Sequence, residues 1–389
     1  MERVVLVINP GSSSNEYAVY RGSQMLLDGY YEPSNDTEHR LTLTGQIEET
    51  RTLTDNDFVD SLQHFLDVLQ TVEYDIAIEV VGVRLVAPGR RFLKHQVLDD
   101  ELIAYLESIR NRAPLHIQAE LQQIRAVQQF LPHLPMYAIS DSAFHHSLSH
   151  EARNYAIPRD DANAYDIYRY GYHGLSVQSI VHQMHEDMKL DLPHVIVCHM
   201  GSGSSITALR DGRSTDTSMG YSPLEGLVMA TRSGTIDIKA AIELKNGLGL
   251  TDDGLIDYLN HSCGLLGLSN ISNDIRILLD REARGDTDAA FALSEMVYRM
   301  TFYIGAYSAI LGGLDAIVFT ATAGERSAIL RRRICESLAH LGIDIDTTIN
   351  DRTDTTRQCI TKPSSKIAVY VIPTDETAEI ARQTIALSD

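Results

Sequence analysis

The chain has 389 residues, of which 44% are hydrophobic and 22% are charged. This is an ordinary globular composition, and the length predicts two or three domains. The formal net charge of −20 at pH 7 argues against a nucleic-acid partner, because such proteins normally carry a basic face. No apolar run reaches the roughly 18 residues that would cross a bilayer, so no membrane role is expected.

The cysteines give no sign of a disulfide framework or a zinc site. Cys198, Cys263, Cys335 and Cys359 form neither a CxxC pair nor a cluster with zinc spacing. Free thiols suit a reducing compartment. The N-terminus runs directly into a strand-like segment without a signal peptide. We therefore expect a soluble cytoplasmic protein.

The first part of the chain alternates between strand-like and helix-like segments. Short β-branched runs predict strands over residues 3–8, 17–20, 76–86 and 136–140. Apolar residues at helical spacing predict helices over 58–69, 99–111 and 117–130, with a break at 113–116. This alternation predicts an α/β layer architecture.

The pattern restarts after a polar stretch at 148–166. Strands are expected over 194–200, 205–210, 315–320 and 367–372. Helices are expected over 287–311, over 325–341 and from near Asp375. The segment 287–311 is apolar almost all round, which predicts burial between layers or a place in a subunit interface.

Two glycine-serine loops echo each other. Asn9–Ser14 follows the first predicted strand, and Gly201–Ser205 follows another, each at the turn of a predicted hairpin. Glycine allows close approach of the backbone, so such loops can cradle phosphate, although a plain hairpin turn explains each one alone. Neither matches a Walker A loop or a Rossmann fingerprint. The echo predicts two related domains with a cleft between them.

Two arginines stand in surroundings that call for an anion. Arg84 lies inside an apolar strand, and Arg232 lies in the turn-like Thr231–Gly234. A buried guanidinium needs an anionic partner, which is either a structural carboxylate or an anionic substrate.

Histidines and acids also fall near predicted strand ends. His116, His173 and His199 lie there, where ligands bind in open α/β sheets, although each alone also fits a structural role. Asp141 and Glu376 are candidate magnesium ligands, and helix capping is the alternative for each.

Taken in order, these motifs resemble the acetate kinase family, within the sugar kinase, actin and chaperone ATPase superfamily. The resemblance covers essentially the whole chain. Its motifs are Asn9–Ser14, Ala113–His116, Asp141–His145, Tyr170–Gly174, Cys198–Ser205, Asp216–Gly220, Pro223–Gly226, Ser272–Asp274, Val318–Ala321 and Ile372–Thr374.

The resemblance implies a two-domain, ribonuclease-H-like duplicated α/β fold with an interdomain cleft. The N-terminal domain would comprise residues 1–146 and 374–389, and the nucleotide-binding and dimerisation domain would comprise 147–373. The implied reaction is reversible transfer of phosphate between ATP and acetate or another short carboxylate, giving acetyl phosphate. It implies Mg²⁺, with Mn²⁺ as an alternative, and a homodimer without nucleic-acid or membrane partners.

The resemblance also assigns residues to roles. The implied catalytic residues are Asp141, Arg232, His173 and Arg84, with His116 and His199 supporting the transition state. The implied substrate pocket is Arg84, Val86, Leu115, Tyr172 and Pro223. The implied nucleotide and phosphate residues are Ser12, Ser14, Glu16, His199, Gly201, Ser202, Gly203, Asp274, Arg276 and Gly324. The implied metal residues are Asn9 and Glu376.

Several positions depart from the family pattern. Glu16 stands where the family usually has lysine, Ser202 replaces asparagine, and Tyr172 replaces a pocket phenylalanine. Further departures lie at Ala87–Gly89 and at Thr322–Arg326, including Thr322 and Arg326 themselves.

Four readings of these departures remain open. In the first, Arg90, Arg91, Lys239 or Arg326 supplies the missing positive charge. In the second, the phosphoryl donor is pyrophosphate or another nucleotide, and in the third, the acceptor is another acid such as propionate. In the fourth, the activity is weakened or lost. We favour an acetate kinase that uses either ATP or a different phosphoryl donor. A non-enzymatic sensor, a butyrate kinase and a sugar kinase are the competing classes, and the narrow pocket argues against a sugar.

Overall fold

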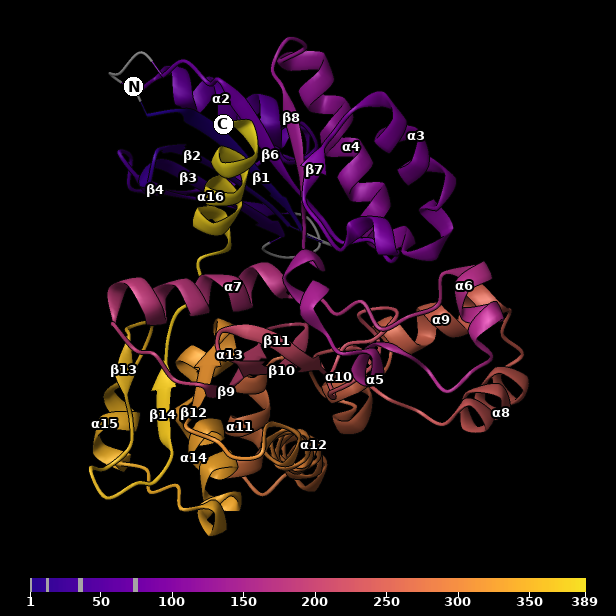
Figure 1. Cartoon of the computed structure of the whole chain (residues 1–389), viewed down its shortest axis with the longest axis vertical. Helices are drawn as coiled ribbons and strands as arrows, with labels where there is room; N and C mark the ends of the chain where they lie inside the picture. The colour runs from indigo at the N-terminus through magenta and orange to yellow at the C-terminus, as the bar shows by residue number, and fades with distance from the viewer. Residues whose placement is uncertain (1, 12–13, 34–37, 73–75) are drawn as a thin grey trace. The chain divides into compact units, whose positions relative to one another are not determined.

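The computed structural model describes residues 2–11, 14–33, 38–72 and 76–389, without the side chains of residues 55, 56, 114 and 115. The chain divides into two compact units (Figure 1). Unit 1 comprises Met1–Ala143, Gly174–Ser179 and Asp375–Asp389. Unit 2 comprises Phe144–His173 and Ile180–Thr374.

Unit 1 is built on a sheet with the strand order β5-β4-β3-β2-β1-β6-β8-β7. The strands are β1 (Val4–Pro10), β2 (Asn15–Arg21), β3 (Gln24–Pro33), β4 (His39–Gly45), β5 (Glu49–Leu53), β6 (Val80–Leu85), β7 (Gln96–Val97) and β8 (Met136–Ser140). β1 and β2 form an antiparallel hairpin, whereas β1, β6 and β8 run parallel. The predicted hairpin around the first glycine-serine loop is confirmed.

Helices cover both faces of this sheet. They are α1 (Asp55–Val59), α2 (Ser61–Gln70), α3 (Asp100–Ser108), α4 (Pro114–Phe130) and α16 (Glu376–Ser388), and α7 (Gly174–His182) begins in this unit. Alternate residues of β1 point to opposite faces, so Leu6 packs with α2, α3 and α4 while Val7 packs with α16. Figure 1 shows α16 in yellow against the strands. Helix α16 therefore covers one face of the sheet of unit 1, although it lies far from the strands of that sheet in the sequence.

The expected break between two helices is present, but it ends at Ala113 and not at His116. α4 begins at Pro114, which occupies the first turn of the helix. Proline suits this position, because its fixed φ is helical and its missing N–H would have no partner there. His116 consequently lies on α4 rather than in a loop.

Unit 2 repeats the strand order of unit 1. Its sheet runs β11-β10-β9-β12-β14-β13, so β11-β10-β9-β12-β14 corresponds to β3-β2-β1-β6-β8. The strands are β9 (His194–Met200), β10 (Ser204–Arg210), β11 (Arg213–Thr217), β12 (Ala316–Thr320), β13 (Gln358–Cys359) and β14 (Ala368–Val371). The second hairpin pairs antiparallel, and β9, β12 and β14 run parallel. The predicted duplicated α/β fold is confirmed.

The helices of unit 2 lie both before and after its hairpin in the chain. They are α5 (His150–Arg153), α6 (Arg159–Tyr165), α8 (Ile238–Leu248), α9 (Asp252–His261), α10 (Gly264–Ser269), α11 (Ile275–Ala283), α12 (Thr287–Leu311), α13 (Ala321–Arg326), α14 (Ala328–Ser337) and α15 (Thr347–Arg352). The single helix expected over 325–341 is wrong, because Ser327 leaves the helical region and its side chain caps α14 at the amide of Leu330.

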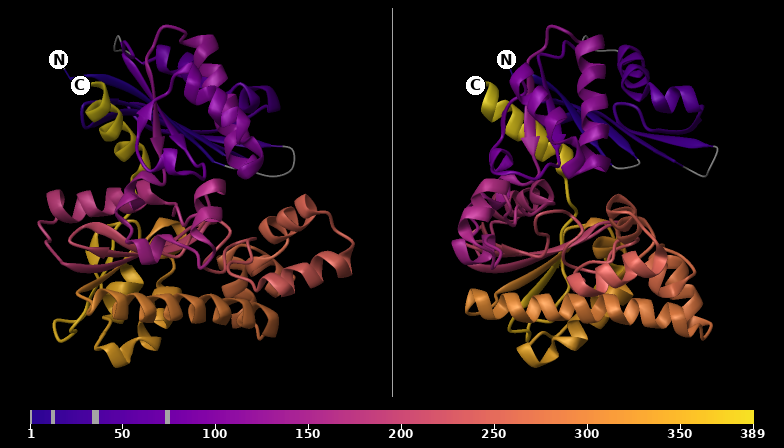
Figure 2. Two further views of the ribbon diagram at one scale, coloured as in Figure 1. Left: turned by 45° about the vertical axis from the view of Figure 1, so that its right-hand side comes forward. Right: turned by 90° about the vertical axis from the view of Figure 1, so that its right-hand side faces the viewer.

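The long helix α12 is buried on one side only. Figure 2 shows it lying along the sheet of unit 2. Leu293, Met300 and other residues at helical spacing enter the core. Phe291, Tyr298 and Phe302 are 56%, 60% and 57% exposed, so burial between layers of one chain is wrong. No helix among the described residues has the length and apolar character to cross a membrane.

Candidate functional site

Three predicted residues meet where the parallel strands of unit 1 end. Asn9 lies on β1, Arg84 lies on β6, and Asp141 directly follows β8. Arg84 Nη1 donates to Asn9 Oδ1 at 3.0 Å, and Arg84 Nη2 donates to Asp141 Oδ2 at 3.2 Å. The carboxyl ends of neighbouring parallel strands are the usual place for a ligand in such a sheet.

Glu376, the first residue of α16, joins the same group. Its Oε2 lies 3.5 Å from Arg84 Nη1 and accepts from Asn9 Nδ2 at 3.4 Å. Burial lowers the pKa of Arg84, but the charges of Asp141 and Glu376 outweigh it, so the pKa is raised overall. Arg84 is therefore a permanent cation held between two acids.

Glu16 occupies the place where a cation was expected. It lies opposite Asn9 in the β1–β2 hairpin, and its Oε2 accepts from Asn9 Nδ2 at 2.7 Å. Burial raises the pKa of Glu16 to about 7. The hydrogen bond from Asn9 acts to lower this pKa, and the negative charges of Glu376 and Asp375 act to raise it. A carboxyl group with this pKa is partly protonated at neutral pH, so it repels a phosphate less than an ordinary carboxylate does.

The predicted metal residues fit a magnesium ion that is shared with a ligand. The described residues contain no group of three or more His, Cys, Asp or Glu that could hold a metal alone. Magnesium usually takes only one or two carboxylates and completes its shell with water and phosphate oxygens. Asn9 Oδ1 and the Glu376 carboxylate are oxygen ligands of this kind, and both face Arg84 Nη1, at 3.0 and 3.5 Å.

The described ends of the first glycine-serine loop are Gly11 and Ser14, which contact each other. The amide of Gly11 donates to the carbonyl of Ser14 at 2.7 Å, and a Cβ on Gly11 would lie 2.8 Å from Ser14 Oγ. A side chain at position 11 would therefore crowd the Ser14 hydroxyl. Ser14 Oγ also accepts from the Tyr30 hydroxyl at 3.4 Å. Ser12 lies outside the described residues.

Two predicted substrate-pocket residues belong to unit 1 besides Arg84. Val86 follows β6, and Leu115 lies at the start of α4. Val86 is buried, and its amide donates to Glu120 Oε1 at 2.6 Å. His116 lies in the first turn of α4, and the side chain of Leu115 lies outside the description. Glu120 was missed by the sequence analysis. Its signal was an acid one helical turn after His116 in a helix that packs on the sheet.

Two predicted histidines of unit 2 stack on each other. The rings of His173 and His199 lie 3.9 Å apart with an angle of 20° between their planes. His173 has a φ of 57°, which is uncommon for a residue other than glycine. Its Nδ1 lies 2.9 Å from Ser205 Oγ, and Ser205 pairs with His199 across the β9–β10 hairpin. Ser205 was not predicted as a site residue, although it is the last residue of the Gly201–Ser205 loop that was predicted to bind phosphate.

The second glycine-serine loop runs along these histidines. A Cβ on Gly203 would lie 3.2 Å from His173 Nε2 and 3.5 Å from Arg232 Nη1. A Cβ on Gly201 would lie 3.4 Å from His199 Nε2. Ser202 between them is exposed, and its carbonyl accepts from the amide of Ala230. Unit 2 therefore brings together four predicted features: both histidines, the loop and Arg232.

Arg232 differs from Arg84 in that no acid among the described residues is paired with it. No hydrogen bond or ion pair joins its guanidinium to any residue that the structure describes. Burial alone lowers the pKa of Arg232. A guanidinium that is withdrawn from water without an anion is unfavourable, so this position is suited to an anionic ligand.

The segment that carries Arg232 is held by the start of α10. The amides of Cys263 and Leu265 donate to the carbonyls of Thr231 and Met229 at 3.0 and 2.8 Å. A Cβ on Gly264, whose φ is 61°, would lie 2.8 Å from the carbonyl oxygen of Arg232. Glycine at 264 therefore allows this close approach.

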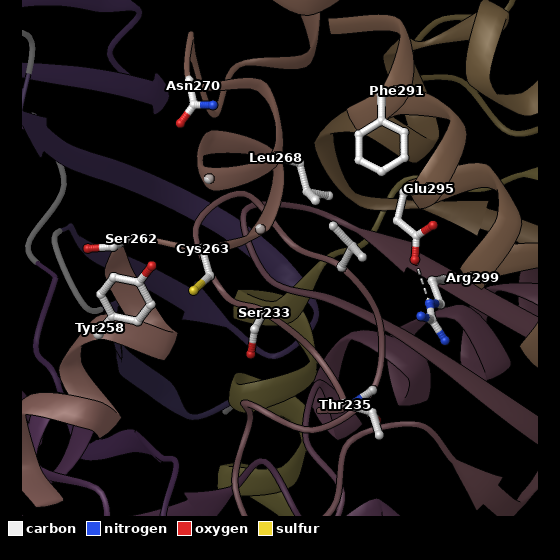
Figure 3. A pocket seen from close by; sticks show the side chains of 14 residues that line it. Ser233, Thr235, Tyr258, Ser262, Cys263, Leu268, Asn270, Phe291, Glu295 and Arg299 are labelled. Carbon is white, nitrogen blue, oxygen red and sulfur yellow. Dashed lines mark hydrogen bonds and ion pairs between the residues drawn. The ribbon is translucent and has the colours of Figure 1, made fainter. Parts of the chain in front are cut away.

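A separate pocket of about 470 Å³ opens beside this segment (Figure 3). Its walls come from residues 226–235, 258–270 and α12, including Cys263, Phe291 and the ion pair of Glu295 with Arg299. None of the lining residues is a predicted site residue. The pocket therefore adjoins the Arg232 segment without containing the predicted chemistry.

The unit 2 part of the predicted substrate pocket includes Tyr172 and Pro223. Tyr172 is buried, and its hydroxyl donates to the carbonyl of Tyr221 at 2.7 Å. The hydroxyl that distinguishes Tyr172 from phenylalanine is thus bonded to the segment that leads into Pro223. His145 Nε2 lies 3.0 Å from the Tyr172 carbonyl and supports the same wall.

The predicted nucleotide residues lie at two places in unit 2. Asp274 caps α11, and the exposed Arg276 binds its carboxylate through Nη2 at 2.6 Å. Gly324 lies on α13, where a Cβ would be 3.4 Å from the backbone of Phe319. Ala321, which begins α13 with a φ of 62°, lies beside the second glycine-serine loop, 3.7 Å from the position of a Cβ on Gly201.

Comparison with known proteins relates the whole chain to one family. The family model described as the Acetokinase family matches residues 4–382. An acetate kinase from Pseudothermotoga lettingae is 37% identical over 98% of this chain and 96% of its own length. The crystal structure of Porphyromonas gingivalis acetate kinase, at 33% identity, covers 100% of both chains with a TM-score of 0.86. A propionate kinase structure from Francisella tularensis, at 33% identity, covers 99% of this chain and 100% of its own with a TM-score of 0.88.

Proposed function

The chain belongs to the acetokinase family and is an enzyme of that family, and from this premise we propose that it transfers a phosphoryl group between ATP and acetate. The products are ADP and acetyl phosphate, and the reaction is reversible. Arg232 carries this proposal. Its unpaired, half-buried guanidinium lies beside His173 and the Gly201–Gly203 loop and is suited to a phosphoryl group.

The proposed transfer is a direct displacement at phosphorus. An oxygen of the acetate carboxylate attacks the γ-phosphorus, the new O–P bond forms, and the bond to the ADP oxygen breaks. Acetate is already an anion at neutral pH, so no base needs to remove a proton from it. Catalysis then depends on positioning and on neutralising charge.

We assign the acceptor to unit 1 and the moving phosphoryl group to unit 2. Arg84 binds the acetate carboxylate, and Val86 and Leu115 of the same unit are the apolar residues that we assign to its methyl group. Asp141 holds the Arg84 fork through its 3.2 Å hydrogen bond. Arg232 and His173 neutralise charge on the phosphoryl group, and His116 and His199 support them.

Asn9 and Glu376 would hold magnesium together with the donor phosphates. The ion supplies charge neutralisation on the phosphate oxygens when it is bound, and manganese is an alternative. Ser12, Ser14 and Glu16 line the phosphate path in this proposal. Gly201, Ser202, Gly203, Asp274, Arg276 and Gly324 serve the nucleotide and its phosphates.

A donor other than ATP is the second candidate, and Glu16 is the observation that favours it. A buried acid hydrogen-bonded to Asn9 stands where a cation is usual in the family. This favours a donor whose phosphates are arranged differently, such as pyrophosphate or another nucleotide. Likewise, the similarity to a propionate kinase makes propionate the second acceptor.

We also propose a cytoplasmic homodimer that forms through unit 2. The exposed aromatic residues Phe291, Tyr298 and Phe302 lie along one side of α12. A contiguous apolar face of this kind is unfavourable in water, and burial against a second copy would remove the cost.

The experiment is a donor and acceptor panel with hydroxylamine as the trap. The enzyme is incubated with magnesium, with acetate or propionate, and with ATP, GTP or pyrophosphate. Hydroxylamine converts the acyl phosphate into a coloured hydroxamate. We expect the strongest signal with acetate and ATP; a stronger signal with pyrophosphate identifies the second candidate donor. No hydroxamate with any combination would refute phosphoryl transfer to a short carboxylate.

A further inference from the structure

Glu120 is a buried acid in unit 1 that has no role in the reaction so far. It lies on α4 and is 1% exposed. Its Oε1 accepts from the amide of Val86 at 2.6 Å, while its Oε2 is buried without a hydrogen-bond partner among the described residues. Buried acids are rare unless they are paired, so this position calls for an explanation.

The amide that Glu120 binds lies at the end of a ladder. β6 pairs with β8 as far as Leu85 and Ser140, and the amide of Asp141 donates to the carbonyl of Leu85. The amide of Val86 belongs to the same peptide unit as the Leu85 carbonyl and points the opposite way, to the β1 side, where the pairing of β6 ends at Val83. Glu120 supplies the acceptor that the ladder does not, and thereby fixes how the chain leaves the strand.

The same strand end carries Arg84, two residues before Val86. The charges of Arg84 and Asp141 both act on Glu120, so the carboxyl group lies within the range of their fields. Arg84 Nε is also buried without a hydrogen-bond partner among the described residues. Among the described residues, hydrogen bonds hold the guanidinium through Nη1 and Nη2, and the backbone that carries it leads two residues later to the amide that Glu120 binds.

We propose that Glu120 is a positioning residue for the phosphoryl acceptor, because it holds the segment from Arg84 to Val86 through the Val86 amide. This inference rests on the proposed function, in which Arg84 and Val86 bind the short carboxylate. Glu120 does not touch the reacting atoms. Its effect belongs to binding and alignment of the carboxylate and not to the phosphoryl donor.

The protonation state of Glu120 indicates which substitution preserves this role. Burial raises the pKa of Glu120 to about 8. The hydrogen bond from the Val86 amide and the charge of Arg84 act to lower this pKa, and the charge of Asp141 acts to raise it. The group is thus mainly neutral at pH 7. Glutamine keeps its size, its neutral state and the Oε1 acceptor, whereas methionine keeps the size and removes the acceptor.

Kinetics of four variants test the inference. In Glu120→Met and Glu120→Asp, which lose the acceptor or shorten its reach, we expect the KM for the carboxylate to rise by about tenfold or more, with the donor KM within about twofold of wild type. Glu120→Gln is expected to restore wild-type values within about threefold. Gln122→Met, at an exposed position of the same helix, is the control and is expected to leave both constants unchanged.

Hydrogen exchange of the Val86 amide gives a readout that does not need turnover. We expect faster exchange in Glu120→Met and Glu120→Asp, and wild-type exchange in Glu120→Gln. Unchanged exchange in Glu120→Asp, or an unchanged carboxylate KM together with a lower melting temperature, would overturn the positioning role. A wild-type enzyme without phosphoryl transfer would instead refute the proposed function, and the exchange data would still decide the role of Glu120.

Discussion

Arg232 and Arg84 show how the surroundings of one residue type separate two roles. Arg84 is held by Asn9, Asp141 and Glu376, whereas no described residue neutralises Arg232. The first is organised before any ligand arrives. The second has a charge available for one, which is what stabilisation of a developing anion requires.

We predict that Arg232→Ala lowers kcat by about 10²–10³-fold, the loss typical of removing one charge contact to a transition state. The melting temperature should stay close to wild type, because the guanidinium makes no hydrogen bond or ion pair with the described residues that the substitution would break. Steady-state kinetics and thermal unfolding measure the two quantities. Arg284→Ala, which removes an exposed guanidinium paired with Asp280, is the control.

The pKa values of buried acids in unit 1 predict an unusual dependence of stability on pH. Burial raises the pKa of Glu16 from 4.5 to about 7 and that of Glu120 from 4.5 to about 8. Between the ordinary and the raised value, the folded chain binds more protons than the unfolded chain. The free energy of unfolding therefore falls as pH rises through this interval.

We expect the melting temperature to decrease from pH 5 to pH 8, and Glu16→Gln to reduce that decrease because glutamine does not titrate. Thermal unfolding at fixed ionic strength measures the effect. A Glu16→Gln variant whose profile runs parallel to that of wild type would show that Glu16 ionises normally in the folded chain.

The site residues that the sequence reveals are those with an unusual local setting. Arg84 inside an apolar run and the glycines at 201 and 203 were visible in the sequence alone. Ser205 and Glu120 were not singled out, because their roles depend on strand register and on the packing of α4. Their partners, His173 and Val86, are remote in the chain.

At the scale of elements, α12 carries the most informative surface. Its buried stripe packs on the sheet, and its opposite side exposes Phe291, Tyr298 and Phe302. An internal core helix would not keep three aromatic residues in water. This face therefore suits a contact with a second copy.

We predict that Phe302→Glu shifts the protein from dimer to monomer, since it places a charge in the proposed apolar interface. Size-exclusion chromatography with light scattering gives the mass directly. Val59→Glu, a substitution of an exposed apolar residue on α1 in unit 1, should leave the dimer intact. A monomeric wild type, or a dimeric Phe302→Glu variant, would contradict the interface.

The sequence predicts helices and strands well where the spacing of apolar residues defines them. It predicts the ends of helices less well, because capping residues define those. Both hairpins follow from short β-branched runs and glycine turns, and both are present. The two errors lie at helix ends, at Pro114 and Ser327. Proline was taken as a break although it begins α4, and a serine cap divides one expected helix in two.

At the scale of the whole molecule, duplication explains why each unit carries its own group of functional residues. The strand order β3-β2-β1-β6-β8 recurs as β11-β10-β9-β12-β14, and each hairpin has a glycine-serine loop at its turn. Unit 1 collects acids around Arg84, and unit 2 collects histidines and glycines around Arg232. One sheet topology thus holds two different chemical settings.

The proposed reaction is the synthesis of acetyl phosphate from acetate and ATP, in which Arg232 neutralises charge on the phosphoryl group. Phosphorus NMR of the enzyme with acetate, magnesium and ATP follows this reaction directly. We predict that the resonance of acetyl phosphate appears with the wild type as ATP is converted to ADP, and is greatly slowed with Arg232→Ala. Consumption of ATP without acetyl phosphate would contradict the proposed reaction, and equal rates in both proteins would contradict the role of Arg232.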